Sequence, residues 1–167
     1  IIFGVLISAR GVVFNQMAQV YGTEMADLVS ATSSLPSGAR VLPLRAAGKQ
    51  RDRRYYHLQG HLVAMHDAFV PTLFQGTHAL KVRDEWVNHA EPVYAAIDLR
   101  WLDARFGTDS SLRPVFVENW EDKFTHAILL DHVDPTAWDD PRLVSMASSG
   151  RFTLYRVVPT PERSTLD

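Results

Sequence analysis

The feature that most constrains the fold is an apolar run late in the chain, His126-Ala127-Ile128-Leu129-Leu130. Consecutive apolar residues without polar alternation are typical of a strand that is covered on both faces of its sheet. Such a strand needs a layer of structure on each side, which a chain of 167 residues can supply within one domain. We therefore expect a layered domain with this run as its central strand.

The other segments are assigned from apolar periodicity and from Gly and Pro stops. Predicted strands lie at 40–44, 79–82, 115–117 and 152–158. Predicted helices lie at 12–34, 55–69, 92–107 and 139–150. Strands separated by helices indicate an α/β fold, here a layered sandwich of a small mixed sheet with helices, preceded by a long N-terminal amphipathic helix.

The chain opens on a nearly pure apolar stretch, Ile1–Ile7, which is followed by Arg10. Seven residues are far fewer than the about 20 that span a bilayer, and no basic residue precedes them as in a signal peptide. The stretch is either a buried first strand or the last turns of a transmembrane helix with Arg10 at the interface. We favour the second interpretation, because the chain begins without Met and the stretch has no polar alternation.

This interpretation sets the expected domain organisation. The tail of an upstream apolar segment occupies 1–11, a single soluble α/β domain occupies 12–158, and a polar C-terminal tail occupies 159–167.

Composition and motifs exclude several functional classes. The net charge of −2 gives no general attraction to nucleic acid, and the absence of cysteine rules out disulfides and thiolate zinc sites. The sequence holds no glycine-rich phosphate loop, dinucleotide fingerprint, EF-hand or nucleophile elbow. We expect no cofactor, no metal, no nucleic-acid partner and no catalytic residue in this chain.

Three groups of residues are candidate ligand contacts. Arg51, Arg53 and Arg54 form a basic loop suited to a phosphate or an anionic headgroup, unless the loop is only solvated. His57 and His61 share one face of a predicted helix, although no third metal ligand accompanies them.

The third group, Asp131 and His132, follows the central strand, where open α/β sheets gather their functional loops. A polar connection to the next element is the alternative. Acids also stand beside Trp86 and Trp120, a pairing that suits sugars, although tryptophans bordering a core are commoner.

Four stretches carry a resemblance to a known family. They are Ser34-Leu35-Pro36-Ser37-Gly38-Ala39-Arg40-Val41-Leu42, Ala68-Phe69-Val70-Pro71-Thr72-Leu73-Phe74, Phe124-Thr125-His126-Ala127-Ile128-Leu129-Leu130 and Phe152-Thr153-Leu154-Tyr155-Arg156-Val157. In this order they resemble the soluble C-terminal domain of bacterial polytopic membrane proteins of the polyprenyl-phosphate-sugar glycosyltransferase type. His126 stands where that family usually has Asp, so any role of that acid is in doubt here.

The resemblance implies a bundle of membrane helices upstream in the same chain, in the bacterial inner membrane, with this domain facing the periplasm. The family's catalytic acids lie in the membrane part, so the expected role is a non-catalytic accessory domain. Its partner would be a lipid-linked sugar or glycan. Two alternatives stay open: an independent α/β binding module with Ile1–Ile7 as a core strand, and an interaction module with the first helix as a dimer face. The sequence leaves the oligomeric state open.

Overall fold

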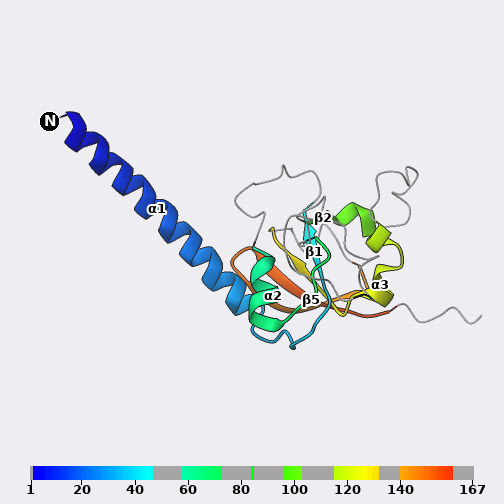
Figure 1. Cartoon of the computed structure of the whole chain (residues 1–167). Helices are drawn as coiled ribbons and strands as arrows, with labels where there is room; N and C mark the ends of the chain where they lie inside the picture. The colour runs from blue at the N-terminus through cyan, green and yellow to red at the C-terminus, as the bar shows by residue number, and fades with distance from the viewer. Residues whose placement is uncertain are drawn as a thin grey trace, which may run out of the picture.

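The structure is a computed structural model, which describes residues 2–46, 58–72, 84, 96–102, 115–131 and 140–159. Its elements are α1 (Ile2–Ala31), β1 (Val41–Arg45), α2 (Gly60–His66), β2 (Ile97–Asp98), the 3₁₀ turns η3 (Leu99–Leu102) and η6 (Val115–Val117), α3 (Trp120–Lys123), β3 (His126–Leu129), β4 (Leu143–Ser149) and β5 (Phe152–Val157). Figure 1 shows that α1 projects from a domain built around a sheet.

The described strands form one mixed sheet in the order β2-β1-β3-β5-β4. Strand β1 runs parallel to β2 and β3, whereas β5 runs antiparallel to β3 and β4. The mixed sheet with its helices confirms the predicted fold class. Strand β3 is central, as the apolar run predicts, and all four of its residues are buried.

Two hydrophobic clusters occupy the two faces of the sheet. Successive residues of a strand alternate between the two clusters. In β1, Val41 belongs to the first cluster and Leu42 to the second, and in β3, Ile128 belongs to the first and Leu129 to the second. Residues of α1 and α2 complete the first cluster, and residues of η3, η6 and α3 complete the second. The domain is therefore a three-layer sandwich, and Figure 1 draws α2 and α3 on opposite sides of β1.

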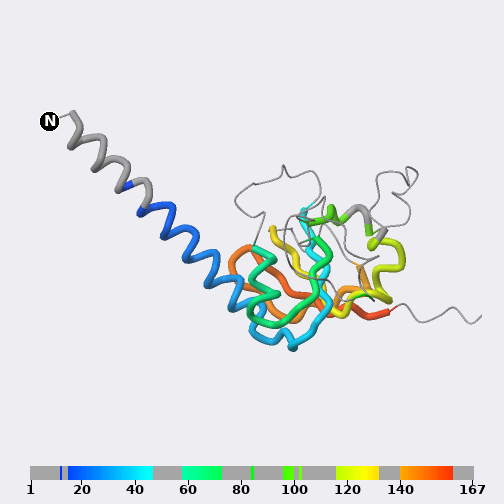
Figure 2. Tube along the Cα trace, viewed as in Figure 1, coloured from blue at the N-terminus to red at the C-terminus, as the bar shows by residue number. Residues whose placement is uncertain are grey.

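Helix α1 is longer than predicted and only partly covered by the domain. It begins at Ile2, ends at Ala31, and buries Leu28 and Ala31 in the first cluster. Side chains 15–23 are exposed, and Figures 1 and 2 show α1 projecting away from the rest of the domain. The interpretation of the chain start as a core strand is wrong, because Ile2–Ile7 continue the helix. No described helix combines the length and the apolar character that crossing a bilayer requires.

The predicted helix at 139–150 is also wrong over its described part. Residues 143–149 form β4, which pairs with β5 in an antiparallel hairpin. Gly150, predicted as the helix stop, has a φ of +54° and lies in the hairpin turn instead. A glycine in the left-handed region ends helices and closes hairpins equally well, so this signal did not separate the two structures.

Other predicted boundaries changed as well. Ile97 lies in β2 and is followed by a 3₁₀ turn, where a helix from Pro92 was expected. Residues 115–117 form a 3₁₀ turn, not a strand. Helix α2 occupies part of the predicted helix at 55–69 and ends at the left-handed Asp67. The predicted strand at 79–82 lies outside the described residues.

Candidate functional site

The carboxyl end of β3, predicted as the best location for a site, carries an ion-pair cluster. Asp131 follows β3, and its Oδ1 lies 3.7 Å from Nη1 of Arg151. Arg151 is the second residue of the hairpin turn, after Gly150, and its Nε lies 4.0 Å from Oε1 of Glu24 on α1. The guanidinium also lies 5.2 Å from the ring centroid of Phe152. One cation thus joins the sheet, the hairpin and the long helix.

The hairpin turn contacts α1 a second time, one helical turn further on. Ser149 Oγ donates a hydrogen bond of 2.9 Å to Oδ1 of Asp27. Gly150 packs so closely that a Cβ placed there would stand 2.6 Å from Cγ of Asp27. We call Glu24, Asp27, Asp131, Ser149, Gly150 and Arg151 the helix–hairpin junction.

The chemistry of this junction is that of an anchor. Its charged side chains are three carboxylates and one guanidinium, and the Arg151, Glu24 and Asp131 side chains are 16, 17 and 23% exposed. Ion pairs at this depth are screened less than surface pairs, and the network spans three elements. Within the described residues, no group of three or more His, Cys, Asp or Glu side chains is placed to hold a metal ion. The junction therefore fixes α1 against the sheet.

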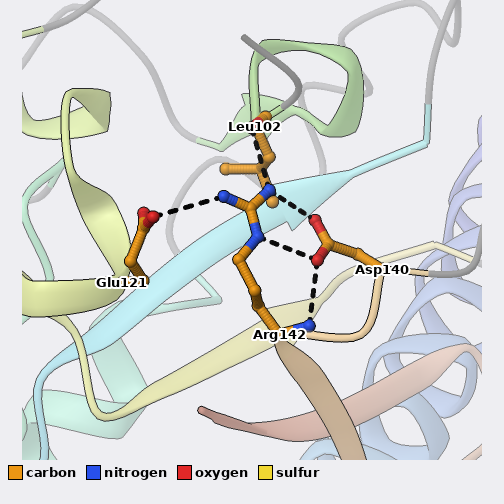
Figure 3. A network of polar contacts seen from close by, with 4 residues as sticks. All are labelled: Leu102, Glu121, Asp140 and Arg142. Carbon is orange, nitrogen blue, oxygen red and sulfur yellow. Dashed lines mark hydrogen bonds and ion pairs between the residues drawn. The ribbon is translucent and has the colours of Figure 1, made fainter. Parts of the chain in front are cut away.

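A second network surrounds Arg142, the residue before β4 (Figure 3). Its guanidinium donates hydrogen bonds to Asp140, at 2.9 Å from Nε and 2.7 Å from Nη2, and to the Leu102 carbonyl at 3.1 Å. Nη1 lies 3.4 Å from Glu121 Oε1. Side-chain hydrogen bonding to Asp140, which accepts from the guanidinium, is the main cause that raises the pKa of Arg142 above its ordinary value. This network ties β4 to η3 and α3.

The Arg142 guanidinium also lies over the ring of Trp120. Trp120 is 1% exposed, and the Arg142 guanidinium lies 4.8 Å from its ring centroid. A sugar therefore cannot stack on this ring, and the alternative of a tryptophan packed in the core is confirmed. Sequence reasoning missed Arg142, and its only local signal was Asp140 two positions earlier.

The structure describes two of the predicted ligand contacts. Asp131 is in the junction, and His61 is exposed on α2. The other predicted contacts, Arg51, Arg53, Arg54, His57 and His132, lie outside the described residues. The basic loop as an anion contact therefore stays a prediction, and so does the pairing of His57 with His61.

His126 lies at the opposite end of β3 from the junction. Its side chain is buried, and Nδ1 is 2.9 Å from Oγ1 of Thr125. Burial, followed by the positive charge of Arg156, lowers the pKa of His126 below its ordinary value of 6.5. Thr125 Oγ1 in turn accepts a hydrogen bond from the Arg40 amide at 3.1 Å. The imidazole and Thr125 thus connect the start of β3 to the residue before β1.

These features define an α/β three-layer domain carried on a long helix and fixed to it by an ion-pair junction. Comparisons of the chain with models of protein families, with curated proteins and with solved structures found no match.

Proposed function

We propose that this chain is a non-catalytic, extracytoplasmic accessory domain of a membrane-bound, glycosyltransferase-like protein. The observation that carries the proposal is the continuity of α1 from Ile2 to Ala31. The apolar opening residues share one helix with the residues that enter the core. A helix of 30 residues is about 45 Å long. It is therefore long enough to act as a stalk that connects the domain to upstream membrane helices of the same chain.

The helix–hairpin junction supports this role, because a stalk is useful only if the domain cannot rotate freely about it. Arg151 contacts both Glu24 of α1 and Asp131 of the sheet. Leu28 packs in the core between these contacts and the end of the helix. Apolar packing and ion pairs together hold the domain in one orientation relative to α1.

The glycosyltransferase-like part of the proposal depends on the four resembling stretches. It assigns the domain to the periplasmic side of the bacterial inner membrane, where it helps to bind an acceptor or a lipid-linked sugar. Phosphate is the group that an arginine loop recognises best, so Arg51, Arg53 and Arg54 are the proposed contacts.

Membrane attachment is tested on the complete gene product. After cell lysis and an alkaline wash, we expect the protein to remain with the membrane pellet. A C-terminal alkaline phosphatase fusion, which is active only outside the cytoplasm, is expected to be active. Recovery of the protein in the supernatant would refute the attachment, and an inactive fusion would refute the periplasmic location.

Ligand binding is tested with a polyprenyl-phosphate sugar in nanodiscs that hold the complete protein. The variant with Arg51, Arg53 and Arg54 all changed to Gln is expected to bind at least tenfold more weakly. Arg156→Gln is the control, because Arg156 is exposed on β5. Equal affinities of the triple variant and the wild type would refute a role of the loop.

One observation favours a second candidate, an interaction module that dimerises through α1. Met17, Val20 and Tyr21 are 54, 50 and 42% exposed, and no charged residue lies between Arg10 and Glu24. Val20→Lys is then expected to convert a dimer into a monomer in light scattering. A wild-type chain that is monomeric at high concentration would remove this candidate.

A further inference from the structure

Helix α1 passes, within two residues, from an exposed segment to a segment that the domain holds. Side chains 15–23 are exposed, whereas Glu24 pairs with Arg151 and Met25 packs against the first hydrophobic cluster. A rod that is held at one end and loaded at the other bends most where its support ends. In α1 that place is the turn around Gly22, just before the helix–hairpin junction.

Gly22 stands at this place without a packing reason. Its φ is not positive, unlike that of Gly38 and Gly150. Apart from its chain neighbours and the backbone of its own helix, no atom of the described residues lies within 4 Å of a Cβ placed at Gly22. Glycine inside a helix has more conformational freedom than alanine and weakens the helix. Gly22 therefore makes bending easier at this turn and gains no contact in return.

Thr23 weakens the same turn by a second, independent route. Its Oγ1 donates a hydrogen bond of 3.1 Å to the carbonyl oxygen of Gln19, one turn earlier in the helix. A hydroxyl that bonds to this carbonyl competes with the backbone ladder, and such bonds often bend helices. No charged residue lies between Arg10 and Glu24, so no ion pair between residues four apart stiffens this turn.

We infer that Gly22 and Thr23 form a bending joint in α1, about which the domain tilts relative to residues 2–21. The junction holds the helix from Glu24 onward, so the domain and the last two turns of α1 move as one body. The joint lies about 30 Å along the helix from Ile2. Its use rests on the proposed function: in a stalk that continues into the membrane, the joint lets the domain tilt over the membrane surface while the upstream helices stay in place.

The absence of cysteine from the chain allows a direct test with pairs of spin labels, whose distances are measured by double electron–electron resonance. The outer pair is Val12→Cys with Ser145→Cys, and the inner pair is Val29→Cys with Ser145→Cys; all three side chains are exposed. Only the outer pair has the joint between its labels. Ten residues of helix separate Val12 from Gly22, or about 15 Å, so a tilt of about 30° displaces the outer label by about 8 Å.

In the 167-residue chain, the distance distribution of the outer pair is expected to be at least twice as broad as that of the inner pair. Gly22→Ala is expected to remove at least half of this excess width. Gly11→Ala, the matched control, changes another glycine of α1 that lies outside the labelled segment, and it is expected to leave the width unchanged. Labelled chains are diluted tenfold with unlabelled chains, so that association through α1 adds no distances.

Three results overturn the inference. They are equal widths of the two pairs, an excess width that Gly22→Ala leaves unchanged, and an equal narrowing by Gly11→Ala and Gly22→Ala. The last result would indicate general fraying of the helix in place of a joint.

Thr23→Val separates the contribution of the hydroxyl group, because valine keeps the branched shape and removes the bond to Gln19. It is expected to narrow the outer distribution less than Gly22→Ala does, and a distribution that is as broad as in the parent chain removes Thr23 from the joint. These distances are measured without a membrane, whereas the fractionation and fusion experiments above test the attachment. Failure of the joint is therefore distinguishable from failure of the proposed function.

Discussion

The helix–hairpin junction makes Gly150 a position where one added methyl group has a large effect. Gly150 has a φ of +54°, a conformation that residues with a Cβ rarely adopt. An alanine Cβ would also stand 2.6 Å from Cγ of Asp27 and 3.0 Å from its Cβ. Asp27 must then turn away and lose the hydrogen bond that Ser149 donates. Gly150→Ala therefore combines backbone strain with the loss of one contact between the hairpin and α1.

Gly38 separates the two effects. Its φ is +75°, and no atom lies within 4 Å of a Cβ placed there. Gly38→Ala is expected to cost only the left-handed strain of about 1–2 kcal/mol. Gly150→Ala adds the lost hydrogen bond to a partly exposed carboxylate, about 1 kcal/mol. The expected total for Gly150→Ala is about 2–3 kcal/mol.

Urea unfolding followed by circular dichroism measures both free energies, and a double-mutant cycle assigns the excess. In the Asp27→Ala background the clash with the carboxyl group is gone. Gly150→Ala is then expected to cost about as much as Gly38→Ala, apart from the remaining Cβ contact. If Gly150→Ala costs the same with and without the Asp27 carboxyl group, to within about 0.5 kcal/mol, the steric reasoning is refuted.

Three further predictions concern separate parts of the molecule. Gly22→Ala lies in open space on an exposed turn of α1 and is expected to raise helicity and stabilise the helix by about 0.5–1 kcal/mol; no gain in the circular dichroism signal would contradict this. Arg142→Gln is expected to lower the free energy of unfolding by about 2–3 kcal/mol. Arg156→Gln, at an exposed residue of β5, is expected to change it by less than about 0.5 kcal/mol. Equal urea midpoints for the two variants would argue against the network. Because burial and then Arg156 lower the pKa of His126 below 6.5, the unfolded chain binds more protons just below pH 6.5, and stability falls as the pH drops from 7 to 5. His126→Gln is expected to make the urea midpoint depend less steeply on pH, and an unchanged dependence would show that other groups cause it.

Elements with a local pattern could be predicted from the sequence. The apolar run identified β3 because a strand paired and covered on both sides needs no polar residue. Alternation identified β5 for the related reason that its Phe152 and Leu154 face one cluster and Val157 the other. Strand β4 could not be predicted in this way. Its acidic start, Pro141 and Gly150 fit a helix locally, and only the pairing with β5 decides between the two structures.

The candidate site was predictable in place but not in composition. Asp131 was expected at the carboxyl end of β3 because topology fixes where strands end. Its partner Arg151 comes from a hairpin that the sequence did not reveal, and Glu24 comes from a helix near the start of the chain. No spacing rule connects residues so far apart, since their proximity exists only once the three layers have packed.

The charged residues of α1 mark the point along the helix at which the domain begins to contact it. Its charged residues are Arg10, Glu24 and Asp27, and both acids contact the hairpin. Apolar periodicity continues on both sides of Glu24, so it does not mark the point at which the domain begins to cover the helix. Glu24 and Asp27 mark that point, because an ion pair or a hydrogen bond with the hairpin forms only where the hairpin is adjacent. Substitutions before Glu24 are therefore expected to leave the packing of the domain against α1 unchanged, whereas substitutions of Glu24 or Asp27 are expected to weaken it.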